Sequence, residues 1–86
     1  MSERYACAVP GCRRTILARR IYPHDSWICD LHWRSVARGL KSRYRRMKRG
    51  LRTERDPARK LRRQRMCVDL WKRCVVAAIE AAAGIG

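Results

Sequence analysis

CAVPGCRRTILARRIYPHDSWICDLH, residues 7–32, begins with a cysteine and ends with a histidine, and the expected fold is built around these two ends. Cys7 and Cys12 form a C-x4-C pair, Cys29 and His32 form a C-x2-H pair, and sixteen residues separate the pairs. Cysteine and histidine at such spacings are typical of structural zinc sites. The sequence therefore predicts one Zn²⁺, with four ligands supplied by these four side chains.

Local geometry supports convergence of the two pairs. Pro10-Gly11 predicts a tight turn between the first two thiols, and Cys29 and His32 lie three residues apart, so they project from one face of a helical first turn. Four protein ligands fill a tetrahedral zinc and leave no position for a water nucleophile, so we expect a structural metal. His24, in the turn region, is the alternative imidazole ligand.

The cysteine count and the chain length point in the same direction. An 86-residue chain buries a limited core, and a metal can supply part of its folding free energy. The N-terminus lacks a secretory signal, so we expect a cytoplasmic protein whose five cysteines stay reduced. Cys67 and Cys74 lie about 10 Å apart along a helix, too far to share one ion unaided or to form a disulfide. We expect core or interface residues there, which leaves a homodimer possible.

Short β-structure is expected inside the zinc module and not before it. Residues 1–6 are expected to be a disordered lead. β-branched, aliphatic and aromatic residues at 15–17, 21–22 and 27–28, with the turn-forming residues 23–26 between them, predict a short, irregular β-hairpin within 13–28.

Two long helices are expected to follow. Apolar residues recur at steps of three and four over 30–50, with Gly50 as the expected C-terminal breaker. Asp56 and Pro57 have the chemistry of an N-cap followed by proline at the first helical position, and the same periodicity continues over 57–83. Two helices that each carry one apolar stripe bury it most simply as an antiparallel hairpin.

The expected architecture is a single small α+β zinc-bound domain over residues 1–86. Its zinc module spans 7–35, and the knuckle, hairpin and helix with ligands in its first turn resemble treble-clef zinc fingers. The first basic helix (30–50) and the second helix (57–83) complete the domain.

The charge predicts a polyanionic partner. The chain has 18 Arg, 4 Lys and 7 acidic residues, a net charge of +15, and residues 34–73 hold 17 of the basic and only 3 of the acidic side chains. Guanidinium groups bind phosphate in a forked geometry, so the arginine bias favours nucleic acid. The predicted contacts are Arg34, Arg38, Lys41, Arg45, Arg46, Lys48, Arg49, Arg52, Arg59, Arg62, Arg63 and Arg65.

Other partners remain open at this stage. The same charge fits an acidic protein surface or a merely solvated helix face. A membrane partner is not expected, because no apolar run approaches about 20 residues and the aromatic residues fit the core of a helical hairpin. Asn is absent and Gln64 is the one side-chain amide, so contacts with phosphate and shape, on DNA or RNA, are favoured over base readout.

No catalytic constellation is evident, and we expect no enzyme. The knuckle, the His24-Asp25 pair and the C-x2-H pair resemble treble-clef HNH nucleases over about 30 residues. That family needs an Asn and a second His for its catalytic metal. This chain has no Asn and only two His, one of them an expected zinc ligand.

CAVPGC, CDLHW, the segment SVARGLKSRYRR and an alanine-rich C-terminal helix resemble small zinc-finger proteins encoded by bacteriophages and prophages. The resemblance implies a treble-clef-like module carrying two helices, and an origin in a phage or its bacterial host. The leading hypothesis is a non-enzymatic nucleic-acid-binding protein in the cytoplasm of the host cell. The alternatives are a phage protein that inhibits or redirects host nucleic-acid machinery, as an anti-CRISPR protein or polymerase-binding regulator does, and a basic subunit of a larger assembly.

Overall fold

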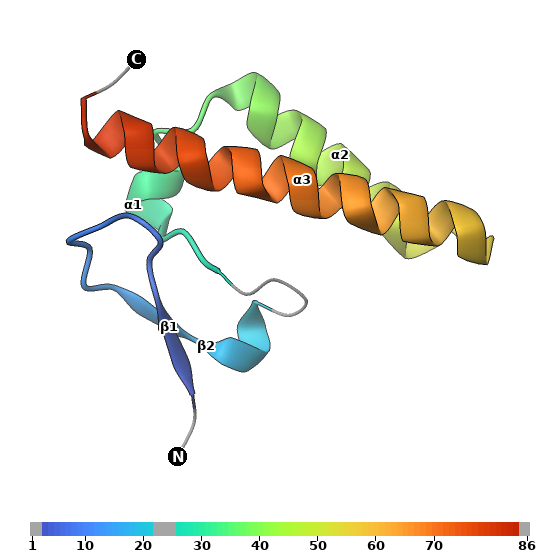
Figure 1. The fold of residues 1–86 in the computed structure, drawn as a ribbon, viewed down its shortest axis with the longest axis horizontal. Helices are drawn as coiled ribbons and strands as arrows, with labels where there is room; N and C mark the ends of the chain where they lie inside the picture. The colour runs from blue at the N-terminus through green and yellow to red at the C-terminus, as the bar shows by residue number, and fades with distance from the viewer. Residues whose placement is uncertain (1–2, 22–25, 85–86) are drawn as a thin grey trace.

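A computed structural model of the chain describes residues 3–21 and 26–84. A small N-terminal module lies against one end of a pair of long helices (Figure 1). The elements in chain order are β1 (Arg4–Ala6), β2 (Thr15–Leu17), the short 3-10 helix η1 (Ala18–Arg20), α1 (Asp30–Trp33), α2 (Arg38–Thr53) and α3 (Pro57–Ala82). The α+β class with an antiparallel hairpin and two packed helices is confirmed.

The hairpin forms with a different partner strand from the one expected. β2 lies at the predicted position, but it pairs with β1, in the segment expected to be a disordered lead, with Tyr5 opposite Ile16. The knuckle itself is the hairpin loop, because the Cys7 N–H donates to the Arg14 carbonyl at 2.9 Å and continues the pairing. Trp27 forms only an isolated parallel bridge with Cys7. Most of the turn expected at 23–26 lies outside the described residues.

The helix expected over 30–50 is interrupted. α1 ends at Trp33, and the N–H groups of Ser35 and Val36 donate to carbonyls three residues back, at 3.2 and 3.1 Å. The Ser35 hydroxyl also donates to the His32 carbonyl at 2.6 Å, which competes with the helical pattern. Val36 is buried by this bend, and α2 begins only after Ala37, whose backbone is not helical.

Gly50 does not end α2, which continues to Thr53. A Cβ at this position would collide with the guanidinium of Arg63. The missing side chain lets Arg63 cross from α3 and form an ion pair with Glu54 at 3.0 Å. Gly50 therefore serves the contact between the helices and not the end of one.

α3 begins as its cap chemistry predicts and ends one residue before the expected Ala83. The Asp56 carboxylate accepts a hydrogen bond from the Arg59 N–H at 2.9 Å, and Pro57 is the first helical residue. Gly84 follows the C-cap with φ of +77°, a backbone conformation that favours glycine. Among the described residues, no helix is both long and apolar enough to cross a membrane.

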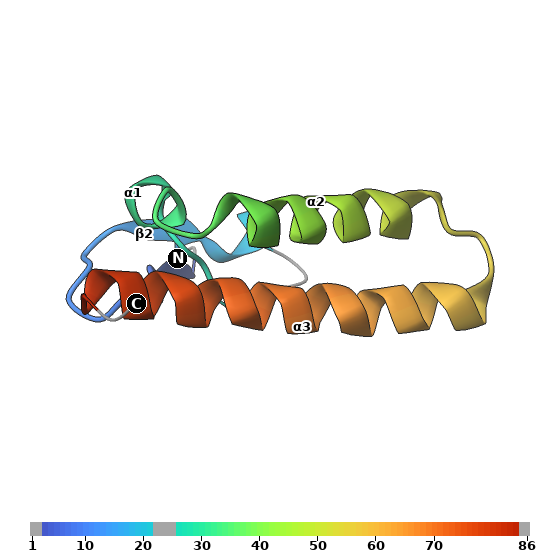
Figure 2. The same ribbon diagram turned by 90° about the horizontal axis from the view of Figure 1, so that it is seen from above.

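One core joins the N-terminal module to the helical hairpin, whose two helices run antiparallel side by side (Figure 2). Tyr44 of α2 packs against Trp33 and Trp71, with ring centroids 6.2 and 5.4 Å away. Cys67 and Cys74 are buried in the same core, as expected, and burial raises the pKa of both thiols. Trp71 also donates to the Ser26 hydroxyl at 2.7 Å, which ties α3 to the module.

The two glycines of α2 give a matched stability test. Gly39→Ala meets nothing within 4 Å, but it lies in the first turn of α2, so we expect it to raise the free energy of unfolding by less than the gain of about 0.5–1 kcal/mol at a helix-interior site. Gly50→Ala should also gain less than that amount, because the Arg63 guanidinium must shift away from the added methyl group and its contact with Glu54 weakens. Urea denaturation of both variants measures the changes. A full gain of about 1 kcal/mol for Gly50→Ala would show that Arg63 accommodates the methyl group without loss.

Candidate metal centre and basic surface

Four ligand atoms, the sulfurs of Cys7, Cys12 and Cys29 and a ring nitrogen of His32, lie within 4.8 Å of one another and could hold a metal ion. The Cys12 and Cys29 sulfurs are 3.8 Å apart, and His32 Nδ1 lies 3.2 Å from Cys29 Sγ and 3.6 Å from Cys7 Sγ. A tetrahedron with metal–sulfur bonds of about 2.3 Å has sulfur–sulfur edges of about 3.8 Å. The 3.8 Å separation of the Cys12 and Cys29 sulfurs matches such an edge, and the four atoms together lie close enough to hold one ion.

The local fold positions each ligand pair. The positive φ of Gly11 (86°) turns the chain between the first two cysteines, and the Cys12 N–H donates to the Val9 carbonyl at 3.1 Å. Cys29 is the N-cap residue of α1, and His32 lies in the single turn of that helix. The Cys29 N–H donates to the Cys7 sulfur at 3.3 Å, which links the two pairs directly.

The electrostatics of the cluster favour a thiolate at Cys29. Burial alone would raise the pKa of this thiol, but hydrogen bonds with His32, Cys12 and Cys7 outweigh burial and lower it from 9.0 to about 7. Burial raises the pKa of Cys7. Metals bind the thiolate form, so the lowered pKa of Cys29 favours metal binding at this thiol. His24, the alternative ligand, lies outside the described residues.

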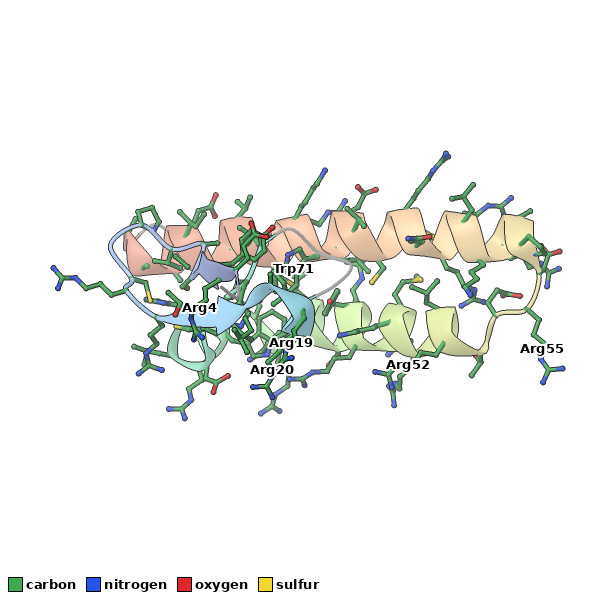
Figure 3. The ribbon with its side chains drawn as sticks, turned by 90° about the horizontal axis from the view of Figure 1, so that it is seen from below. Arg4, Arg19, Arg20, Arg52, Arg55 and Trp71 are labelled. Atoms are coloured by element: carbon green, nitrogen blue, oxygen red, sulfur yellow. The ribbon has the colours of Figure 1, made fainter. Side chains whose placement is uncertain are left out.

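The predicted nucleic-acid contacts fall into separate groups. Four of them lie at i, i+3, i+4 and i+7 on α2 and line one hollow of about 320 Å³: Arg45, Lys48, Arg49 and Arg52. In Figure 3, Arg52 points from α2 away from α3. Every lining side chain of this hollow is cationic, and none of the four forms a salt bridge within the described residues, although the Lys48 ammonium lies 5.8 Å from the centroid of the Tyr44 ring. Solvent, salt or a bound anion would relieve the repulsion among them.

A second group lines a groove between α2 and α3. It contains four predicted residues, Arg46, Arg59, Arg62 and Arg63, together with Arg43, Arg73 and Met66, which the sequence analysis did not single out. The ion pair of Arg63 with Glu54 is the one salt bridge within residues 3–21 and 26–84. The other arginines of this group have no carboxylate partner in that part of the chain.

The remaining predicted contacts are less uniform. Arg34, Arg38 and Arg65 are exposed and line neither hollow. Lys41 is half-buried, donates to the Trp33 carbonyl at 3.3 Å and lies 5.8 Å from the centroid of the Trp33 ring, so it has a structural role.

Sequence reasoning missed one cation that the fold brings to α2. Arg20 of η1 lines a further hollow together with Lys48, a residue that also lines the all-cationic hollow. Figure 3, which views the molecule from below, labels Arg19 and Arg20 on η1. Arg19 and Arg20 lie outside the dense basic run at 34–73, so nothing in the sequence groups them with α2. The fold brings Arg20 and Lys48 to the same hollow.

Comparison with known protein families, curated proteins and solved structures found no significant match to this chain.

The metal centre gives a direct prediction. We expect purified protein to retain one metal ion per chain, and Cys29→Ser to lose it, because the remaining three ligands bind far more weakly. Cys67→Ala is the matched control, since it removes a buried thiol outside the cluster. Elemental analysis after exhaustive dialysis measures the metal content. Equal loss of metal from both variants would contradict the assignment of these four ligands.

Proposed function

We propose that this protein is a non-enzymatic, zinc-stabilised nucleic-acid-binding protein of phage or bacterial origin that acts in the bacterial cytoplasm. The observation that carries the proposal is the hollow formed by Arg45, Lys48, Arg49 and Arg52, whose lining side chains are all cationic and form no salt bridge within the residues that the structure describes. Phosphate groups are the anions that best fit such a cationic hollow, since one arginine can bind two phosphate oxygens at once.

Zinc is the metal that suits the site. Three cysteine sulfurs and one imidazole nitrogen that lie within 4.8 Å of one another are the ligand set of many structural zinc centres, and four protein ligands would leave no open position for catalysis. In the treble-clef-like interpretation, the ion holds the knuckle against the start of α1. The resemblance to small phage zinc-finger proteins supports this interpretation and the origin.

The metal centre contributes to nucleic-acid binding by fixing the position of α2. Cys29 and His32 fix α1, the bend at 34–37 follows directly, and α2 begins at Arg38. The all-cationic hollow on α2 is therefore held in a fixed position relative to the N-terminal module, which carries Arg20. A rigid cationic surface loses less conformational entropy on binding than a flexible arginine tract does.

The contacts favour the backbone over the bases. The lining groups of the hollow are guanidinium and ammonium groups, which contact phosphates without reading sequence. We therefore expect binding to duplex and single-stranded nucleic acid with small sequence preference and a strong dependence on salt.

A pair of double variants tests which surface binds. Arg45→Gln/Arg49→Gln removes two cations from the α2 hollow, and Arg62→Gln/Arg65→Gln removes the same charge from α3. On duplex DNA, we expect the first variant to reduce the slope of log K against log salt by about two, and the second to reduce it by less than one.

The measurement is fluorescence anisotropy with a labelled duplex and a labelled single strand over a salt series. Equal effects of the two variants would show a diffuse response to net charge and would contradict a defined surface. Absence of binding at low salt would overturn the proposed function itself.

A further inference from the structure

The groove between α2 and α3 combines an apolar floor with a cationic rim. Two adjoining hollows, of about 350 and 360 Å³, share Met47, Arg63 and Met66. No lining residue belongs to the part of the N-terminal module that the structure describes. The groove is therefore a surface separate from the all-cationic hollow on α2.

The floor is apolar and accessible. The side chain of Met66 is 46% exposed, Met47 is half-buried, and Leu70 closes the base of the groove with only 8% exposure. Methionine side chains adapt their shape to different apolar partners, which suits them to binding surfaces. An apolar partner that covers these side chains removes them from water, and this burial contributes hydrophobic free energy to binding.

The rim selects the charge of the partner. Six arginines line the two hollows, against the single carboxylate of Asp69, and one of them, Arg63, already has Glu54 as partner. The lining arginines are Arg43, Arg46, Arg59, Arg62, Arg63 and Arg73. Complementarity therefore demands a partner that is acidic at its edges and apolar at its centre.

Other occupants match only part of this surface. A phosphate backbone would satisfy the arginines but gain nothing from Met47, Met66 and Leu70, and none of the described lining residues is an aromatic platform for a base. A second copy of the chain carries the same charge of +15 and would be repelled. A flat lipid surface fits a convex face better than a floor between two helices.

We propose that this groove docks an acidic amphipathic helix of a partner protein. Apolar side chains at i, i+3 or i+4, and i+7 of that helix cover Met47, Met66 and Leu70, and its flanking carboxylates pair with the arginine rim. This binding does not depend on the α2 hollow that carries the proposed function, because the two surfaces share no lining residue.

The test uses a synthetic peptide of about 18 residues, long enough for a helix of several turns, with leucines at helical spacing and glutamates on both flanks. A peptide of the same composition in scrambled order has the same charge without an apolar face. The chain has only three methionines, so ¹³C-methyl NMR with single substitutions assigns the signals of Met47 and Met66. We expect the amphipathic peptide to shift both signals and the scrambled peptide to shift neither.

Matched variants separate the floor from general effects. Met66→Gln should weaken peptide binding about fivefold, and Leu61→Gln, which changes an equally exposed apolar side chain of α3 outside the groove, should leave it unchanged. Neither variant should alter the affinity for duplex DNA. Equal binding of the two peptides, or equal effects of the two variants, would overturn the proposal.

The remaining arms identify a different occupant. Duplex DNA, vesicles with anionic lipid and increasing protein concentration are each added without peptide. A shift of the Met47 and Met66 signals in any of these arms that matches the shift with the amphipathic peptide would overturn the proposal in favour of nucleic acid, membrane or a second copy. Peptide binding with no DNA binding would leave this inference standing and overturn the nucleic-acid function.

Discussion

Three thiols and one imidazole converge where the knuckle meets the start of α1, and the buried core of the protein includes two of these ligand residues. The paired strands that lead into and out of the knuckle are three residues each, too short to be stable alone in water. Cys7 and Cys29 are both ligand candidates and members of the buried core that contains Tyr44 and Cys74. A metal at this point would therefore stabilise the N-terminal module, whose strands are short, and its packing against the helical hairpin.

The path from the cluster to the helices is short. His32 lies one residue before Trp33, whose ring packs on Tyr44 and Trp71, so the position of the ligand helix sets the position of the aromatic contacts. The hydrogen bond that Trp71 donates to Ser26 is a further link between α3 and the N-terminal module. Displacement of the cluster would consequently disturb the end of the helical hairpin nearest to it.

The sequence predicted the parts of the fold that rest on chemistry at fixed spacing. The four ligands follow from two short motifs, and the start of α3 follows from Asp56 and Pro57. Tertiary context decided the parts that were missed. The segment Arg4–Ala6 is too short to show a strand pattern, and Ser35 and Val36 fit helical periodicity although a hydroxyl-to-carbonyl bond bends the chain there. Gly50 showed the usual signal of a helix end, but it makes room for an arginine from the other helix.

The same limit applies to the surface. Composition predicted a basic protein but not how the fold distributes its charge. The fold separates an all-cationic stripe on α2 from a groove in which arginines surround methionines. If the two proposals hold together, this small chain brings a nucleic acid and an acidic protein segment to different faces of one helical hairpin.

The candidate metal ligands and the helical hairpin share one core. Native-state amide hydrogen exchange, compared between metal-loaded protein and protein treated with a chelator, measures whether they are stabilised together. We expect removal of the metal to lower protection in residues 4–33 and also around Tyr44 and Cys74, because these residues lie in the same buried cluster. Loss confined to residues 4–33, with full protection of α2 and α3, would contradict this expectation.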